Sequence, residues 1–435
     1  MANHRPIKYI DLFAGCGGLG DGFEASGKFV GVGHVEWDSA ACATLRNRLL
    51  TKWGYPNASS LVIQDDIQDL ASISTGSGGG HHHPHAGLDA LVADAGGLEL
   101  VIGGPPCQAY SVAGRIRDVN GMQDDYRNYL FESYLAIVQR YGPKAIVFEN
   151  VPGMLSAKPG GIEIAQRIRR AFNSAGFVLP EDLKTCVVNM SQFGVPQVRK
   201  RVIIVGLHKS IKNAEVLLNC FYNDLLPSQR RKPRSAGDAI GDLPPLLPLK
   251  KLSQQSGRRQ SHRNSNAPVL DHEPRFHSDR DQRIFTLLAK DRQRASPKYQ
   301  AVEALKALYT EQTGKTSAVH KYHVIDPHQP SNLIPAHLYK DGLRHIHFDP
   351  RQARSITVRE AARLQGFPDD YCFLGSQGDR YKMIGNAVPP MFAHCLADAV
   401  SSMFHAMARG QAPARKSSAI HATNRHPSKR RKAPD

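Results

Sequence analysis

The stretch Tyr9-Ile10-Asp11-Leu12-Phe13-Ala14-Gly15-Cys16-Gly17-Gly18-Leu19-Gly20 decides the fold of this chain. Its first half is apolar and predicts a buried strand, and its second half sets Gly15, Gly17 and Gly20 in the pattern G-x-G-x-x-G. Glycines at this spacing let the backbone approach a ligand where a helix begins, so we expect a helix through Phe23 next. The stretch predicts a nucleotide-type ligand at the C-terminal end of a first strand.

The next two predicted strands end in side chains that suit the same ligand. Strand 29–35 is followed by Glu36, at the spacing where an acidic residue accepts from ribose hydroxyls, and by Trp37, whose ring could lie against an adenine face. A third strand, near 62–67, places Asp66 where it could read an adenine amino group. A nicotinamide dehydrogenase, an adenosylmethionine methyltransferase and a plain nucleotide-binding domain all fit this pattern.

A second organising stretch, Val-Ile-Gly-Gly-Pro-Pro-Cys-Gln-Ala-Tyr-Ser, spans residues 101–111. The apolar start predicts a buried strand, the glycines allow a sharp turn, and the two prolines stiffen the path and forbid a helix. Cys107 is therefore expected on a rigid loop at the edge of the sheet where ligands bind. There its thiolate could act as a nucleophile; the alternative is a small, buried apolar residue.

Two further groups are expected at the same edge. The predicted strand 144–148 ends at Glu149, which suits a proton donor, although an ordinary carboxylate at a strand end is the alternative. Alternation in the extended segment that follows Pro196 puts Gln197, Arg199 and Arg201 on one face.

Together these stretches resemble the DNA cytosine-C5 methyltransferase family, over about residues 8–206 and 325–408. The stretches that carry the resemblance occur in the family's order: Asp11–Gly20, Gly103–Ser111, Glu149–Val151, Gln197–Arg201, Arg359–Pro368 and Gly385–Pro390. Tyr110 departs from the family, where Phe is more usual, and so does a histidine-rich insertion that contains His81 to His85. The histidines could bind a metal, but a solvated loop is the expected interpretation and no metal is expected.

The resemblance implies an α/β fold with a class I methyltransferase-like, Rossmann-type sheet and a smaller, irregular target-recognition domain. It also implies methyl transfer from S-adenosylmethionine, with S-adenosylhomocysteine as product, to a flipped-out cytosine through a covalent Cys107–C6 intermediate. Glu149 would hold N3, and Arg199 and Arg201 would hold the base carbonyl and orient Glu149. The cofactor pocket would be lined by Phe13, Gly15, Gly17, Gly18, Leu19, Glu36, Trp37, Asp66, Ile67, Pro106, Leu130, Asn386 and Val388.

Composition and charge agree with a nucleic-acid partner. The formal charge is +17, which indicates a polyanion, although part of the excess lies in the C-terminal tail. The 7 cysteines are scattered, which is not a disulfide framework and indicates a reduced compartment. The start of the chain lacks the apolar centre of a signal peptide, and no apolar run is long enough to span a membrane. We expect a bacterial cytoplasmic, nucleoid-associated monomer on double-stranded DNA, with a separately encoded restriction endonuclease as a further partner.

The expected organisation is a catalytic domain over 1–206, a target-recognition domain over 207–350, a return to the sheet over 351–408 and a basic, disordered tail over 409–435. The middle segment is rich in basic residues, beginning with Arg230-Arg231-Lys232-Pro233-Arg234. This composition favours duplex DNA over the tRNA-methylating branch of the same family, which is the alternative substrate. A non-enzymatic DNA-binding regulator would need a lost nucleophile, and a dehydrogenase has no use for the Pro-Cys-Gln motif.

Overall fold

The computed structural model describes residues 5–76, 85–106, 130–158, 163–255, 258–263, 269–340 and 342–410. In this part of the chain the main sheet has the strand order β3-β2-β1-β4-β5-β8-β6, with β7 also paired to β8. Its strands are β1 Ile7–Leu12, β2 Phe29–Glu36, β3 Val62–Gln64, β4 Leu100–Gly103, β5 Ala145–Asn150, β6 Phe177–Val178, β7 Val187–Asn189 and β8 Lys200–His208.

The first five strands are parallel, and β8 pairs antiparallel with β5. Because β2 lies on one side of β1 and β4 on the other, the strand order reverses at β1, where open α/β sheets bind ligands beyond the carboxyl ends of their strands. This arrangement confirms the predicted α/β fold with a Rossmann-type sheet.

Alternate residues of the strands enter two separate apolar cores. Tyr9 and Ile102 belong to the core beneath α1 and α15, whereas Ile10 and Val101 belong to the core beneath α7 and α8. Both faces of the sheet are covered, as buried parallel sheets require. The helices of this part are α1 Gly18–Ala25, α2 Ser39–Thr51, α3 Ala58–Leu61, α4 Leu70–Thr75, α5 Gly87–Asp94, α7 Leu130–Tyr141, α8 Ile164–Ser174, α9 Ala214–Cys220 and α15 Pro390–Arg409.

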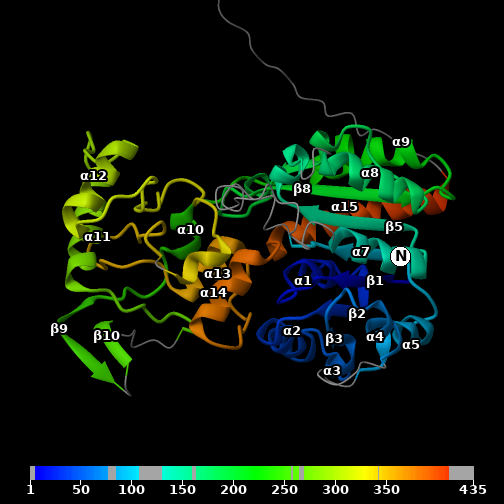
Figure 1. The fold of residues 1–435 in the computed structure, drawn as a ribbon, viewed down its shortest axis with the longest axis horizontal. Helices are drawn as coiled ribbons and strands as arrows, with labels where there is room; N and C mark the ends of the chain where they lie inside the picture. Colours follow the sequence, from blue (N-terminus) through cyan, green and yellow to red (C-terminus); the bar gives the residue numbers. More distant parts are fainter. Residues whose placement is uncertain are drawn as a thin grey trace, which may run out of the picture.

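A second lobe lies beyond the carboxyl ends of β1 to β5 (Figure 1). Its helices α11 and α12 surround a small core of their own that includes Phe285 and Leu308, beside a two-stranded hairpin. The strands of the hairpin are mostly polar, so no apolar pattern marks them in the sequence. The elements of the lobe are β9 Pro248–Gln255, β10 Arg258–His262, α11 Asp279–Arg292 and α12 Val302–Thr313.

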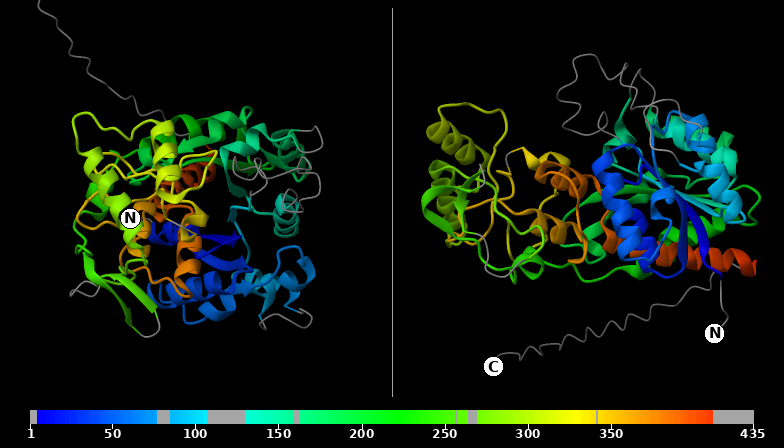
Figure 2. Two further views of the ribbon diagram at one scale, coloured as in Figure 1. Left: turned by 60° about the vertical axis from the view of Figure 1, so that its left-hand side comes forward. Right: turned by 90° about the horizontal axis from the view of Figure 1, so that it is seen from below.

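The chain then returns to the sheet through a junction built from α10 Ala236–Ile240, α13 Val358–Gln365 and α14 Gln377–Asn386. Figure 1 labels these elements between the sheet and the second lobe, and the right-hand view of Figure 2 shows α13 and α14, in orange, at the same place. Arg354 and Glu360 form a fully buried bidentate pair in this junction, with both N–O distances 2.7 Å. His347 lies 3.5 Å from Glu360, and burial lowers the pKa of His347 to about 4, so its imidazole is neutral. No helix in the described part is long and apolar enough to cross a membrane.

Candidate active site

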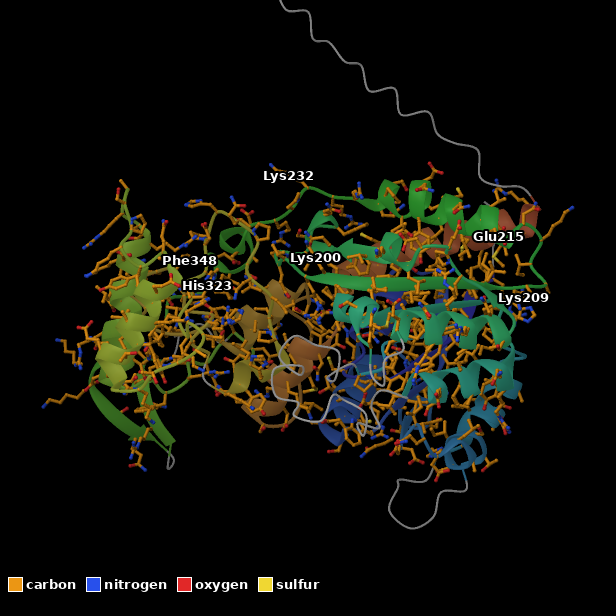
Figure 3. The ribbon with its side chains drawn as sticks, turned by 45° about the horizontal axis from the view of Figure 1, so that its top comes forward. Lys200, Lys209, Glu215, Lys232, His323 and Phe348 are labelled. Atoms are coloured by element: carbon orange, nitrogen blue, oxygen red, sulfur yellow. The ribbon has the colours of Figure 1, made fainter. Side chains whose placement is uncertain are left out.

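The candidate active site lies where the parallel strands end. The loop after Leu12, the end of β2 at Glu36, the turn after Gly103 and the last residues of β5 share this edge through the parallel pairing of β1, β2, β4 and β5. Because β8 runs antiparallel to β5, its first residues, Lys200 and Arg201, lie at the same edge. Figure 3 shows Lys200 at the end of β8 that faces the second lobe, with Lys209 at the far end.

The glycine loop after β1 has the backbone that its sequence demands. Gly15 and Gly17 adopt left-handed conformations, with φ of 57° and 93°, and Phe13 shares this region with φ of 57°. The amide of Gly15 donates to Glu36 Oε2 at 2.8 Å, which fixes the loop against the end of β2. The backbone of the glycine loop is therefore held at the ligand-binding edge of the sheet.

The Glu36 carboxylate has fewer lone pairs free for a ribose hydroxyl than the sequence indicates, because backbone amides use most of them. Besides the Gly15 amide, it accepts the amides of Trp37 and Asp38, both at 2.9 Å from Oε1. Burial raises the pKa of Glu36, and the three amides act in the opposite direction because they stabilise the charged form. A carboxylate has about four lone-pair sites, so roughly one stays free for a ribose hydroxyl.

The C-terminal segment closes the other side of the glycine loop. The Tyr371 hydroxyl donates to the carbonyl of Cys16, and Lys382 pairs with Asp38 at 2.8 Å. A Cβ on Gly18 would lie 2.5 Å from the carbonyl oxygen of Val388, so only glycine fits there. Sequence reasoning missed Tyr371 and Lys382, because nothing local marks residues that meet the loop from more than 300 positions away.

The remaining predicted cofactor residues differ in exposure. Trp37 is 68% exposed, and Asn386, Asp66 and Pro106 are also exposed. Leu19, Ile67, Leu130 and Val388 are buried. Within the described residues, the Asp66 carboxylate accepts the Gln68 amide through Oδ1 at 3.0 Å, whereas its neighbour Asp65 is buried and accepts the Ser72 hydroxyl.

Glu149 and Arg201 form an ion pair at the edge between β5 and β8. Arg201 Nε lies 2.9 Å from Glu149 Oε1, and their side chains are 13% and 12% exposed. A Cβ on Gly104 would lie 2.7 Å from Glu149 Oε2, so the turn after β4 runs directly over this carboxylate. Cys107 lies outside the described residues, three positions after Gly104 in the chain.

Arg199 lies elsewhere, although it shares the predicted face with Arg201. It is fully buried and donates to the carbonyls of Ile334 at 3.4 Å and Gly385 at 3.1 Å. Burial holds the pKa of Arg199 well below its usual range, with Arg201 adding to the effect and Glu149 opposing it. The structure thus brings Glu149 to Arg201, and it ties Arg199 to two backbone segments. A direct contact of Arg199 with a base stays a prediction.

A metal centre finds no support in the described ranges. No group of three or more His, Cys, Asp or Glu side chains is placed there to hold an ion. His81 to His83 of the insertion lie outside these ranges, while His85 stands 3.7 Å from Asp65 in a buried pair.

Comparison with known proteins agrees with this geometry. Residues 7–402 match the family model described as C-5 cytosine-specific DNA methylase. The chain is 33% identical to the type II methyltransferase M.Bpa9945I of Bacillus paralicheniformis, over 91% of this chain and 99% of that protein. It is 30% identical to the type II methyltransferase M1.HphI of Haemophilus parahaemolyticus, over 91% and 87%.

Solved structures share the fold. A prophage-encoded E. coli protein of the DNA modification methyltransferase type has a TM-score of 0.58 at 23% identity, covering 92% of this chain and 99% of that one. The Dnmt2 methyltransferase of S. pombe has a TM-score of 0.51 at 14% identity, with the same coverage.

Proposed function

Because this chain belongs to the C-5 cytosine-specific DNA methylase family, we propose that it methylates C5 of one cytosine within a specific site of duplex DNA, through a transient bond between Cys107 and C6 of that base. The observation that carries the proposal is the Glu149–Arg201 ion pair, at 2.9 Å, beneath the turn that leads to Cys107. The pair and the glycine loop share one edge of the sheet.

Cytosine C5 is too weak a nucleophile to accept a methyl group unaided. Attack of the Cys107 thiolate on C6 makes C5 enamine-like, and a proton from Glu149 at N3 offsets the charge that develops on the ring. Arg201 holds Glu149 in place through Nε, while its Nη1 donates to the carbonyl of Lys200 at 2.8 Å. Once C5 carries the methyl group, loss of the C5 proton, return of the N3 proton to Glu149 and expulsion of the Cys107 thiolate release 5-methylcytosine.

The residues around the glycine loop fit S-adenosylmethionine, which supplies the methyl group when it is bound. The left-handed backbone at Gly15 leaves open space beside the loop, since a Cβ placed there would meet nothing within 4 Å. The free acceptor of Glu36 suits a ribose hydroxyl, and the exposed Trp37 ring suits an adenine face. Asp66 keeps one carboxylate oxygen for the adenine amino group.

The target base has to leave the helix, because C6 is shielded within a duplex. The second lobe faces the strand ends; its helix α11 carries exposed Arg283 and Lys290, and α12 carries the half-buried Lys306. Such cations position phosphates, while a few other side chains read base edges. We propose that this lobe is the target-recognition domain; within the predicted range 207–350, helix α9 instead packs into the apolar core of the sheet.

The likeness to type II methyltransferases supports a protective role beside a separately encoded restriction endonuclease. Bisulfite sequencing of DNA from cells that express this chain tests the activity and identifies the site together. Purified protein should transfer methyl groups to duplex DNA that contains this site and not to tRNA. Transfer to tRNA alone would overturn the proposal.

A further inference from the structure

Gln197 makes a buried amide connection between two distant segments. Its Oε1 accepts the amide of Ile334 at 3.0 Å, and its Nε2 donates to Gln365 Oε1 at 2.5 Å and to the carbonyl of Leu364 at 3.3 Å. The side chains of Gln197 and Gln365 are both fully buried. Ile334 lies on the segment that returns from the second lobe, and Gln365 is the last residue of α13.

Gln365 extends the connection to the cofactor side. Its Nε2 donates to the carbonyl of Ala387 at 2.6 Å. Ala387 and Val388 pack directly against the glycine loop. A Cβ placed on Gly18 would lie 3.1 Å from Ala387 Cβ and 2.5 Å from the carbonyl oxygen of Val388. A shift of the turn at 386–388 would therefore displace the glycine loop, and through the hydrogen bonds of Gln365 it would also displace Gln197.

The other end of the connection reaches the proposed base site. The segment of Gln197 is bonded to the returning chain by Val198 N to Ser331 O at 2.8 Å and Ser331 N to Pro196 O at 2.9 Å. Four residues after Gln197, Arg201 pairs with Glu149. One run of hydrogen bonds thus joins the Arg201 segment, the chain from the second lobe and the turn against the glycine loop.

We propose that Gln197 and Gln365 are positioning residues that couple cofactor binding to the binding of target DNA; the inference rests on the proposed function of the two sites. Each amide in the relay donates and accepts at once. Removing one amide leaves a buried partner unsatisfied, which is why the relay favours one joint arrangement of the segments. Arg199 connects Ile334 to Gly385 in parallel, so breaking the relay weakens the coupling without abolishing it.

Coupling of this kind is reciprocal: if bound cofactor tightens DNA binding by a factor, DNA tightens cofactor binding by the same factor. The experiment measures that factor with S-adenosylhomocysteine and a duplex that carries the site found by bisulfite sequencing. DNA affinity is measured by fluorescence anisotropy with and without S-adenosylhomocysteine, and S-adenosylhomocysteine affinity by calorimetry with and without DNA. We expect roughly a tenfold factor in the unmodified protein, within the usual range for coupled sites.

Two substitutions at position 365 distinguish the loss of the Nε2 donor alone from the loss of the whole amide group. Gln365→Glu keeps an acceptor for Gln197 and loses the donor to Ala387, whereas Gln365→Met loses both. Both should reduce the coupling factor to about threefold or less, by the same amount in each direction. The matched control is Gln166→Met, at an exposed glutamine of α8 whose side chain donates to Glu163, and it should keep the full factor.

Thermal unfolding without ligands distinguishes positioning from stability alone. If the Gln365 variants lower the unfolding temperature, or both affinities, while the coupling factor stays at the unmodified value, the relay is only structural and the inference is overturned. If the unmodified protein neither methylates DNA nor binds it, the proposed function fails instead, independently of the relay.

Discussion

Replacing Arg201 by methionine removes the cation that holds Glu149 while keeping a side chain of similar length. Arg201 Nε lies 2.9 Å from Glu149 Oε1, and the two side chains are only 12% and 13% exposed, so solvent screens the pair weakly. A charge-assisted contact at this separation contributes about 1.5–3 kcal/mol. If the contact acts in the transition state, its loss slows methyl transfer roughly 10- to 150-fold.

The assay is single-turnover transfer of a tritiated methyl group to duplex DNA, with cofactor and DNA both saturating. Glu149→Gln removes the proton donor itself and should slow transfer by about 10²- to 10⁴-fold. Because Arg201 acts through Glu149, the double variant should be about as slow as Glu149→Gln alone. Arg140→Met, which breaks an exposed pair with Asp89, is the matched control and should keep the rate within about twofold.

A double variant in which the effects of the two substitutions on the transfer rate multiply refutes this reasoning. If the double variant is slower than Glu149→Gln by the full factor seen for Arg201→Met, the two side chains act independently. An unchanged rate for Arg201→Met would refute it equally.

The remaining predictions concern the junction and the glycine loop. Glu360→Gln leaves Arg354 buried without its anion and should lower the free energy of unfolding by roughly 3–5 kcal/mol in urea titrations; a loss below about 1 kcal/mol would contradict the account. His347, with a folded pKa of about 4 against about 6.5 unfolded, contributes stability that is complete above pH 6.5 and is lost as pH falls toward 4. The loss for this group at pH 5 should be about 2 kcal/mol, so His347→Gln should flatten the decline of the urea midpoint between pH 7.5 and 5, and an identical decline would rule out this role. Gly18→Ala should weaken S-adenosylhomocysteine binding more than Gly15→Ala in calorimetry, because only the first Cβ meets a backbone oxygen, at 2.5 Å; equal losses would argue against closure of the loop by the turn at 386–388.

Much of the fold could be predicted from local patterns. The apolar runs in β1, β4 and β5 indicate strands with two covered faces, and the glycines after β1 permit the left-handed backbone that the loop adopts. The same reasoning placed Glu149 at the ligand edge. It put Gln197, Arg199 and Arg201 on one face, which the burial of the first two and the exposure of Val198 and Lys200 confirm.

What the sequence could not predict depends on contacts between distant segments. Arg199 and Arg201 share a motif and a face, but the chain that returns from the second lobe covers Arg199 and leaves Arg201 to Glu149. Glu36 has the spacing of a ribose ligand, yet three amides take most of its capacity once the loop is closed. Gln365 looks like one polar residue of a short helix until Gln197 and Ala387 are brought to it.

The most direct test of the central claim is covalent capture on a duplex in which the target cytosine is 5-fluorocytosine. Fluorine at C5 cannot leave as a proton does, so with S-adenosylmethionine the unmodified protein should form a complex with the DNA that survives denaturing electrophoresis. Cys107→Ser should form none, while it still binds S-adenosylhomocysteine. A captured complex with Cys107→Ser, or none with the unmodified protein on a site that it methylates, would contradict the account.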